Sequence, residues 1–198
     1  CHVNGAQGCG GGIMDSAFSY VISKGGLSTE AAYPYTSGGG NSGSCEKKAM
    51  FKAPISGYHD VTPGSVNAMV AGLAKNPVSI AVDASQGWQT YGGGTLSDQC
   101  GTSLDHGVLV VGYTAKYWIV KNSWATTWGE DGYIYLKRNS CKSTGDGECG
   151  LLADASYPTT TAAMATYDEL PDVAQVHTVS QTWLAGKVAG GSDYEDPT

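Results

Sequence analysis

The chain is poor in charged residues, and basic residues are the scarcer kind. Charged side chains make up 15% of its 198 residues, against roughly 25% in soluble domains. With 11 Lys and Arg against 18 Asp and Glu, the net charge is −7, which excludes a broad basic face, so we expect no nucleic-acid partner. Long apolar runs are also missing. The stretch 107–113 falls far short of the roughly 18 residues that suggest a membrane span.

Metal-ligand spacing is absent as well. The six cysteines include no Cys-x₂-Cys pair, which argues against a zinc site, so we expect no metal and no cofactor. What the chain has in excess is glycine, with 29 residues. Such a composition is typical of many tight turns and excludes a helical bundle or a coiled coil.

The acidic charge is concentrated at the C-terminal end. Residues 159–198 hold six acidic residues and one Lys, which accounts for −5 of the net −7. A Thr/Ala-rich run begins there, directly after Pro158. We therefore interpret 1–158 as the globular part and 159–198 as a C-terminal extension. This extension is either a linker or an interaction tail, with a docking segment around Trp183 and a disordered tail as the alternatives.

Hydrophobic spacing predicts helices first and strands later. Apolar residues at helical spacing indicate a helix over 12–24, ended by a glycine pair at Gly25. A second helix is expected over 65–74, with Ser65 as N-cap, and 33–45 reads as an irregular loop. This order indicates an α+β protein with an antiparallel sheet or barrel in its second half. The predicted strands, short and rich in β-branched or aromatic residues, are 78–83, 107–113, 117–121 and 132–138.

The strongest chemical signal is the pair His106 and Asn122. The His enters one predicted strand and the Asn follows the next strand 16 residues later, so a hairpin brings them together. The amide oxygen would accept a ring N–H, fix the tautomer and leave the other ring nitrogen for a nucleophile. Trp124 would shield this hydrogen bond from water. A lone His, or a hairpin rich in Trp and Gly, can be pure packing; the whole string over 121–133 argues for catalysis.

Several motifs carry a family resemblance through their order and spacing. They are Gly8-Cys9-Gly10-Gly11-Gly12, Tyr33-Pro34-Tyr35, Asn76-Pro77-Val78-Ser79, Asp105-His106, Asn122-Ser123-Trp124, and Cys149-Gly150-Leu151 with Tyr157-Pro158. On these motifs the chain resembles the papain-like cysteine proteases, in particular the cathepsin L-like branch. The resemblance implies a two-lobed α+β fold that acts on protein or peptide substrates. Residues 1–50 would be the remainder of a helical lobe, and 51–158 an antiparallel β-barrel lobe that carries the His and the Asn.

The resemblance also implies roles for individual residues. His106 would be the general base and acid, and Asn122 its orienter. Peptide backbone would lie against Gly11 and Gly12 in the manner of an added strand. The remaining residues implied to contact substrate are Asp105, then Met14, Ala81, Leu104, Gly107 and Asp154 around a P2 pocket, with Trp124 and Trp128 on the primed side of the cleft. Asp154 at the pocket floor would admit a basic P2 side chain, the alternative being that it points to solvent.

One family feature is missing from this sequence. The family's nucleophile lies in a Cys-Gly-Ser-Cys-Trp motif roughly 130–150 residues before the His, which counts back to a point upstream of Cys1. No such motif occurs in the chain, and Cys9 precedes His106 by only 97 residues. We expect a cysteine endopeptidase whose nucleophile lies outside this chain, so that the chain alone is inactive. The alternative is a catalytically inactive, protease-derived structural or assembly protein that uses the fold and the tail for interactions.

Cysteine usage indicates an oxidising compartment, which means a secreted or a lysosomal/vacuolar protein. The resemblance pairs Cys1 with Cys45 and Cys100 with Cys149. The usual partner of Cys9 lies just before the nucleophile, so Cys9 would link this chain to a missing N-terminal lobe or a companion chain. Cys141 has no family counterpart, and a bond between Cys9 and Cys141 stays open.

Overall fold

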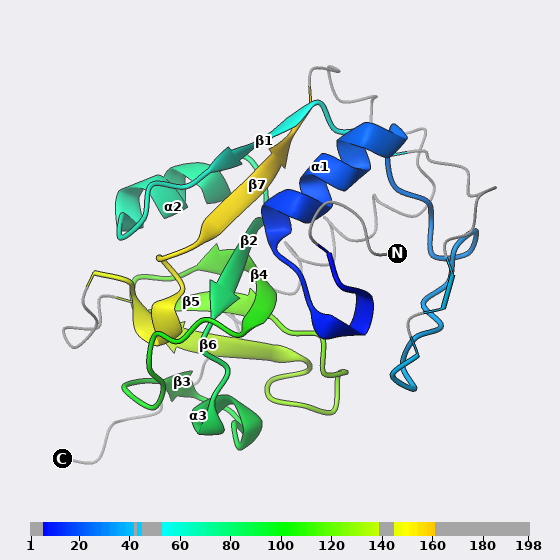
Figure 1. Cartoon of the computed structure of the whole chain (residues 1–198). Coiled ribbons are helices and arrows are strands. Elements are labelled where there is room, and N and C mark those ends of the chain that lie inside the picture. The colour runs from blue at the N-terminus through cyan, green and yellow to red at the C-terminus, as the bar shows by residue number, and fades with distance from the viewer. Residues whose placement is uncertain (1–5, 42, 45–52, 139–144, 161–198) are drawn as a thin grey trace, which may run out of the picture. The chain divides into compact units, whose positions relative to one another are not determined.

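A computed structural model describes residues 6–41, 43–44, 53–138 and 145–160 (Figure 1). It confirms the predicted α+β class. The helical elements are η1 (Gly8–Gly10), α1 (Met14–Lys24), α2 (Val66–Leu73), α3 (Gln86–Gln89) and η2 (Glu148–Gly150). The strands are β1 (Gly57–Asp60), β2 (Val78–Val82), β3 (Thr95–Leu96), β4 (His106–Tyr113), β5 (Tyr117–Lys121), β6 (Tyr133–Lys137) and β7 (Ala155–Thr159).

Both predicted helices are present, and the causes expected for the end of α1 and for the start of α2 are confirmed. Helix α1 stops where Gly25 adopts a left-handed conformation, φ 78°, and its N–H bonds back to the carbonyl of Ile22. Helix α2 starts after Ser65, whose side-chain oxygen accepts the N–H of Ala68 at 3.1 Å. This bond satisfies one of the donors that every helix N-terminus leaves unpaired.

The strands form one seven-stranded sheet in the order β1-β7-β2-β4-β5-β6-β3. Neighbours pair antiparallel except β3 with β6, which are parallel. Strand β5 has the predicted bounds, and β4 begins one residue earlier than predicted, at His106. Strands β1, β3 and β7 were not predicted from the sequence. Strand β3 has only two residues, and β7 carries Pro158, a residue that normally argues against a strand.

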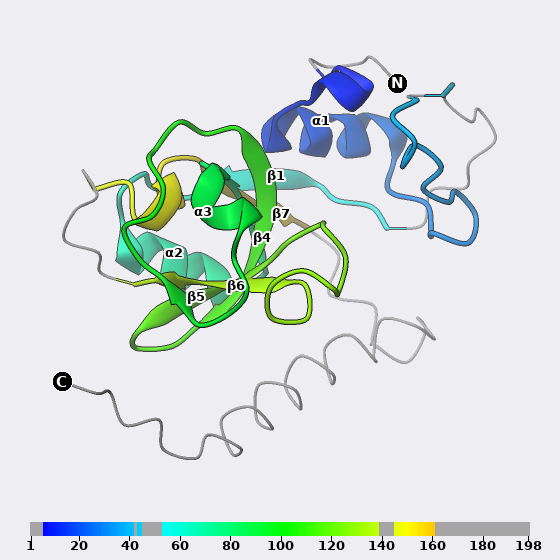
Figure 2. The same ribbon diagram turned by 90° about the horizontal axis from the view of Figure 1, so that it is seen from below.

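The two faces of the sheet are covered differently. Adjacent residues of a strand point to opposite faces, so Tyr58 and its neighbour His59 are separated by the sheet. Phe18 of α1 stacks on Tyr58 at 5.7 Å between ring centroids, while His59 and Tyr157 share the other face, where Gly72 of α2 lies against the Tyr157 ring. Helices α1 and α2 therefore cover opposite faces (Figures 1 and 2).

The core lies on the face that α2 covers. Its largest fully buried members, which come from α2, α3, every strand from β2 to β6 except β3, and the segment after η2, are Trp88, Trp118, Met69, Ile80, Ile134, Leu136, Leu151, Val78, Val82, Val110 and Val120. The opposite face is less covered along β4 and β5, and the candidate site is located at the ends of these two strands.

Several sequence predictions fall outside the described residues. These are the pairing of Cys1 with Cys45, any bond of Cys141, and the extension from residue 161 onward. Over the part of the chain that the structure describes, no helix has both the length and the apolar character needed to cross a membrane.

The N-cap of α2 gives a first stability test. Replacing Ser65 by Ala removes the acceptor for the Ala68 N–H, and we expect the free energy of unfolding to fall by about 0.5–2 kcal/mol. Urea denaturation followed by circular dichroism measures the change. Ser65→Asp keeps an acceptor at the cap and serves as the control, and equal losses in both variants would contradict a capping role.

Candidate functional site

The site is built on the pairing of β4 with β5. Leu109 lies opposite Lys121 in this antiparallel pair, so the first residue of β4 and the residue after β5 meet at one end of the sheet. His106 Nε2 lies 2.9 Å from Asn122 Oδ1. Asn122 is 8% exposed, and His106 is partly buried. The structure thus brings together the two residues that the sequence analysis placed at the centre of the chemistry.

A neighbouring backbone group decides which atoms of this pair carry hydrogen. The Ser123 N–H also bonds to Asn122 Oδ1, at 2.8 Å. A backbone N–H can only donate, so the amide oxygen, not the amide nitrogen, must face both partners. An amide oxygen can only accept, so Nε2 of His106 carries the proton and the neutral ring keeps its lone pair on Nδ1. In this tautomer Nδ1 is the atom able to take a proton from a nucleophile.

Aromatic rings enclose the imidazole. Trp124 lies against His106 with 5.1 Å between ring centroids and an angle of 32° between planes, and it remains 36% exposed. Trp88 meets His106 edge to face at 6.0 Å, and it is fully buried. One ring therefore covers the imidazole at the surface, and the other supports it from the core. Both exclude water from the His106–Asn122 hydrogen bond, which strengthens it.

Trp128 is oriented toward the core. Its indole N–H donates to the carbonyl of Trp88 at 3.1 Å, and the two rings stack at 5.9 Å. Tyr91 packs on the Trp128 ring at 5.6 Å, and its hydroxyl donates to the Gly94 carbonyl at 2.5 Å. Burial raises the pKa of Tyr91 to about 12, so the hydroxyl stays a donor over the physiological range. Of the two Trp residues expected at the cleft wall, Trp124 is the more accessible.

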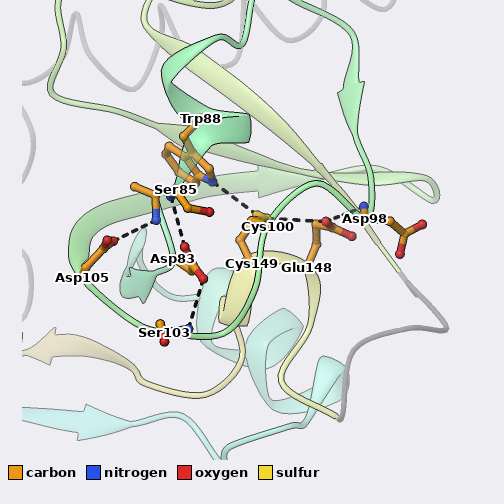
Figure 3. Close-up of a disulfide and its surroundings, with 10 residues drawn as sticks. Asp83, Ser85, Trp88, Asp98, Cys100, Ser103, Asp105, Glu148 and Cys149 are labelled. Carbon is orange, nitrogen blue, oxygen red and sulfur yellow. Dashed lines mark hydrogen bonds between the residues drawn. A yellow bond between two sulfur atoms is a disulfide. The ribbon is translucent and has the colours of Figure 1, made fainter.

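The chain that leads into His106 is held by two carboxylates. Asp83, 6% exposed, accepts the N–H groups of Ser85 at 3.1 Å and Ser103 at 3.2 Å. Asp105 accepts the Ala84 N–H at 2.9 Å (Figure 3). Burial by itself raises the pKa of Asp83, but the hydrogen bonds from Ser85 and Ser103 outweigh it, and the pKa lies below its usual value. Asp105, expected at the substrate site, is thus engaged in fixing the turn between β2 and α3.

The same region contains a disulfide. Cys100 and Cys149 are joined, as the family resemblance implied, with 5.1 Å between their Cα atoms. The Trp88 indole N–H donates to Cys149 Sγ at 3.3 Å. Sequence reasoning missed Trp88, which belongs to none of the motifs. The sequence did contain one indication of it. A Trp directly after Gly87 suggests a large ring at a point where two backbone segments pack closely.

An open pocket of about 400 Å³ adjoins the His106–Asn122 pair. Its lining residues come from α1, β2, β4 and the end of β5, and they are Met14, Ser79, Gly107, Val108, Leu109, Lys121, Asn122 and Ser123. Of the residues expected around a P2 pocket, it includes Met14 and Gly107. Ala81 lies opposite Gly107 in the sheet, and Leu104 is 38% exposed outside the pocket. Gly11 and Gly12 are exposed, but the Gly11 N–H donates to the Gly8 carbonyl at 3.1 Å and its carbonyl accepts the Gln7 N–H at 2.8 Å, so both groups are engaged within the loop.

Asp154 lies near two other carboxylates. Its carbonyl accepts the Ala81 N–H at 2.9 Å, which fixes its backbone beside β2. Partial burial, together with repulsion from Asp15 of α1 and Asp60 of β1, raises the pKa of its side chain above the usual value. The residue itself is exposed, so water weakens this repulsion. This concentration of negative charge favours either protonation of Asp154 or the approach of a cationic side chain.

Comparison with known proteins agrees with this geometry. The sequence model of a family described as "Papain family cysteine protease" matches residues 1–159. The chain is 43% identical over 164 residues to the probable cysteine protease RD21C of Arabidopsis thaliana, covering 80% of this chain and 36% of that protein. It is also 43% identical over 166 residues to the senescence-specific cysteine protease SAG39 of Oryza sativa subsp. indica, covering 80% and 48%.

A solved structure shows the same fold. The bromelain protease of Ananas comosus, in complex with the E64 inhibitor, superposes with a TM-score of 0.73 at 38% identity, covering 80% of this chain and 74% of that one. The chain thus spans at most about half the length of the two curated relatives above. Both relatives are cysteine proteases, and the residues of this chain that the family model matches include His106 and Asn122.

The raised pKa of Asp154 predicts a pH-dependent stability change. Folding favours its protonated form, so Asp154→Asn should leave stability unchanged at low pH and increase it as pH rises through the folded-state pKa. Because the residue is exposed, we expect a gain below about 1 kcal/mol at pH 7. Urea titrations at pH 3.5 and 7 measure it. Asp131→Asn, an exposed carboxylate in the β5–β6 loop, is the control, and equal gains in both variants would contradict the assignment.

Proposed function

Because the chain belongs to the papain family of cysteine proteases, we propose that it supplies the His-Asn half of a cysteine endopeptidase site. The observation that carries the proposal is the 2.9 Å bond from His106 Nε2 to Asn122 Oδ1, with the oxygen held by the Ser123 N–H. This arrangement defines the tautomer and orientation that a general base needs. It does so at strand ends, where the ring position is rigid.

In the proposed mechanism, Nδ1 of His106 takes the proton of a cysteine thiol. The thiolate attacks the carbonyl carbon of a peptide bond, and the imidazolium then donates its Nδ1 proton to the leaving amine. A water molecule, deprotonated in turn by Nδ1, hydrolyses the resulting thioester and releases the acid product. Asn122 keeps the ring oriented through these proton transfers, because its oxygen accepts from Nε2 in both the neutral and the charged ring.

We also propose that the nucleophilic Cys is carried by a segment outside this chain. The sequence contains no Cys-Gly-Ser-Cys-Trp string. The open pocket beside Asn122 and Gly107 supports a covering segment. A further support is Asn122 Nδ2, a buried donor that has no hydrogen-bond partner among the described residues. A buried donor left unpaired costs about 1–3 kcal/mol, so an acceptor from the covering segment would stabilise the assembled site. On the family resemblance, Cys9, which is exposed on η1, is our candidate for a covalent link to it.

The substrate we propose is an extended peptide. Exposed backbone at Gly12 suits strand-like hydrogen bonding beside the Gly11 loop, and Met14 offers an apolar contact. Asp154 adds selectivity for a basic side chain at P2, since a carboxylate already repelled by Asp15 and Asp60 gains from a neighbouring cation. The Cys100–Cys149 disulfide supports an oxidising location, which we propose to be secreted or vacuolar.

The decisive experiment uses the complete protein that contains this chain. We expect it to hydrolyse a fluorogenic peptide and to be blocked by a thiol-directed epoxide, whereas the 198-residue chain alone does neither. Peptide mapping identifies the labelled Cys. Labelling of Cys9 in the isolated chain would overturn the placement of the nucleophile. A complete protein that folds but shows neither hydrolysis nor labelling would favour the inactive, structural alternative.

The orienting role of Asn122 has its own test in that complete protein. Asn122→Ala removes the acceptor for Nε2, and we expect kcat to fall about tenfold or more with KM little changed, since only proton transfer is affected. The control is Asn67→Ala on the exposed side of α2. Unchanged kcat in Asn122→Ala would contradict the role.

Selectivity at P2 tests Asp154. We expect Asp154→Ala to lower the rate of cleavage of an Arg-Arg reporter relative to a Leu-Arg reporter by about three- to tenfold, because the charge that favours Arg is lost. The ratio of kcat/KM values for the two reporters is the measurement. A ratio that the substitution leaves unchanged would mean that Asp154 does not face the substrate.

A further inference from the structure

Trp88 occupies a position that no motif of the site explains. It lies on the short helix α3, and no part of its side chain is exposed. Its neighbour Gly87 allows this placement, because a Cβ there would come within 2.7 Å of the Gln99 carbonyl oxygen. Helix α3 is thereby packed closely against the segment that leads to Cys100, and the indole is directed into the core.

One side of the Trp88 ring is connected to the candidate site. The ring meets His106 at 6.0 Å with an angle of 84° between planes, and it stacks on Trp128 at 5.9 Å and 19°. The Trp88 carbonyl accepts the Trp128 indole N–H at 3.1 Å. Trp124 also contacts it edge to face at 6.5 Å. Any displacement of Trp88 therefore removes a packing contact from the imidazole of His106 and from the indoles of Trp124 and Trp128.

The other side is connected to the disulfide. The Trp88 indole N–H donates to Cys149 Sγ at 3.3 Å, and Cys149 is 2% exposed (Figure 3). An indole has a single donor, and in this buried position the disulfide sulfur is its acceptor. A buried donor that loses its acceptor is destabilised, which favours movement of the ring toward another arrangement.

We propose that Trp88 is a positioning residue for His106 and that it makes the position of His106 depend on the Cys100–Cys149 disulfide. The proposal rests on the proposed function of the His106–Asn122 pair. When a dithiol reduces the bond, two electrons and two protons convert the disulfide to two thiols, and the dithiol becomes a cyclic disulfide. The separated Cys149 sulfur is then free to rotate away from the indole, and Trp88 loses the contact that fixes its ring. By reciprocity, removing the indole donor makes the disulfide easier to reduce.

The test uses the 198-residue chain, so it does not require peptidase activity. Trp88→Phe keeps an aromatic ring and removes the N–H donor. Trp118→Phe is the matched control, because Trp118 is 1% exposed and contacts Tyr113 and Arg138 in place of the disulfide. Long-range ¹H–¹⁵N spectra report the imidazole tautomer. In Trp88→Phe we expect the two ring ¹⁵N resonances of His106 to move toward each other as the tautomers mix. The control should leave them unchanged, and His59 provides an internal reference.

Reduction gives a second, independent measurement. We expect the disulfide of Trp88→Phe to be half reduced at a ratio of reduced to oxidised dithiothreitol about two- to tenfold lower than in Trp118→Phe. This is the shift that the loss of one net hydrogen bond to the disulfide would cause. In the complete protein, Trp88→Phe should lower kcat with little change in KM. If the complete protein is not a peptidase, this kinetic effect cannot be measured. The ¹⁵N spectra and the reduction midpoint of the 198-residue chain then decide the proposal.

Two results would overturn it. One is a Trp88→Phe chain whose His106 resonances and reduction midpoint match those of Trp118→Phe. The other applies if Trp88→Phe does not fold. The test then compares the oxidised and the reduced forms of the unsubstituted chain. His106 must then shift while His59 does not, and a His106 that stays fixed, or that moves only together with His59, counts against the proposal.

Discussion

His106 and Asn122 meet because β4 and β5 pair antiparallel with Leu109 opposite Lys121. That register sets which residues face each other at the strand ends, and a slip of one residue would turn the His side chain to the other face of the sheet. The Ser123 N–H adds the second constraint, since it fixes the amide oxygen and so the ring tautomer. Two backbone features, a strand register and one N–H group, thus determine the direction in which the imidazole can move a proton.

Aromatic side chains and, behind them, the disulfide surround the His106–Asn122 pair. Trp124 covers the ring from the solvent side, and Trp88 supports it from the core, with Trp128 joined to both. Behind Trp88 lie the disulfide and the loop that Asp83 holds through buried hydrogen bonds. Buried polar groups stabilise a fold only when they are paired, and the described residues around α3 satisfy that condition through backbone N–H groups, an indole and a sulfur atom.

The other face of the sheet has a different character. Along β4 and β5 it borders an open pocket that is lined mainly by apolar groups, among them Met14 of α1, and α1 also contacts β1 and β7. Asp15, Asp60 and Asp154 lie near one another beside β1, where partial burial, together with repulsion from the other two carboxylates, raises the pKa of Asp154. This face thus combines an open pocket with three neighbouring carboxylates.

Sequence patterns were sufficient to predict the α+β class, the bounds of β5, the end of α1 at Gly25, the N-cap of α2 at Ser65, and the pairing of His106 with Asn122. Each of these depends on local spacing or on a short hairpin, which residues close in sequence can specify. Strands β1 and β7 were not predicted, because their pairing joins Gly57 to Thr159 across the length of the domain. The role of Trp88 was also decided only by the tertiary structure. Its indole meets a sulfur 61 residues away, and no periodicity or motif encodes a contact that exists only once the core has closed.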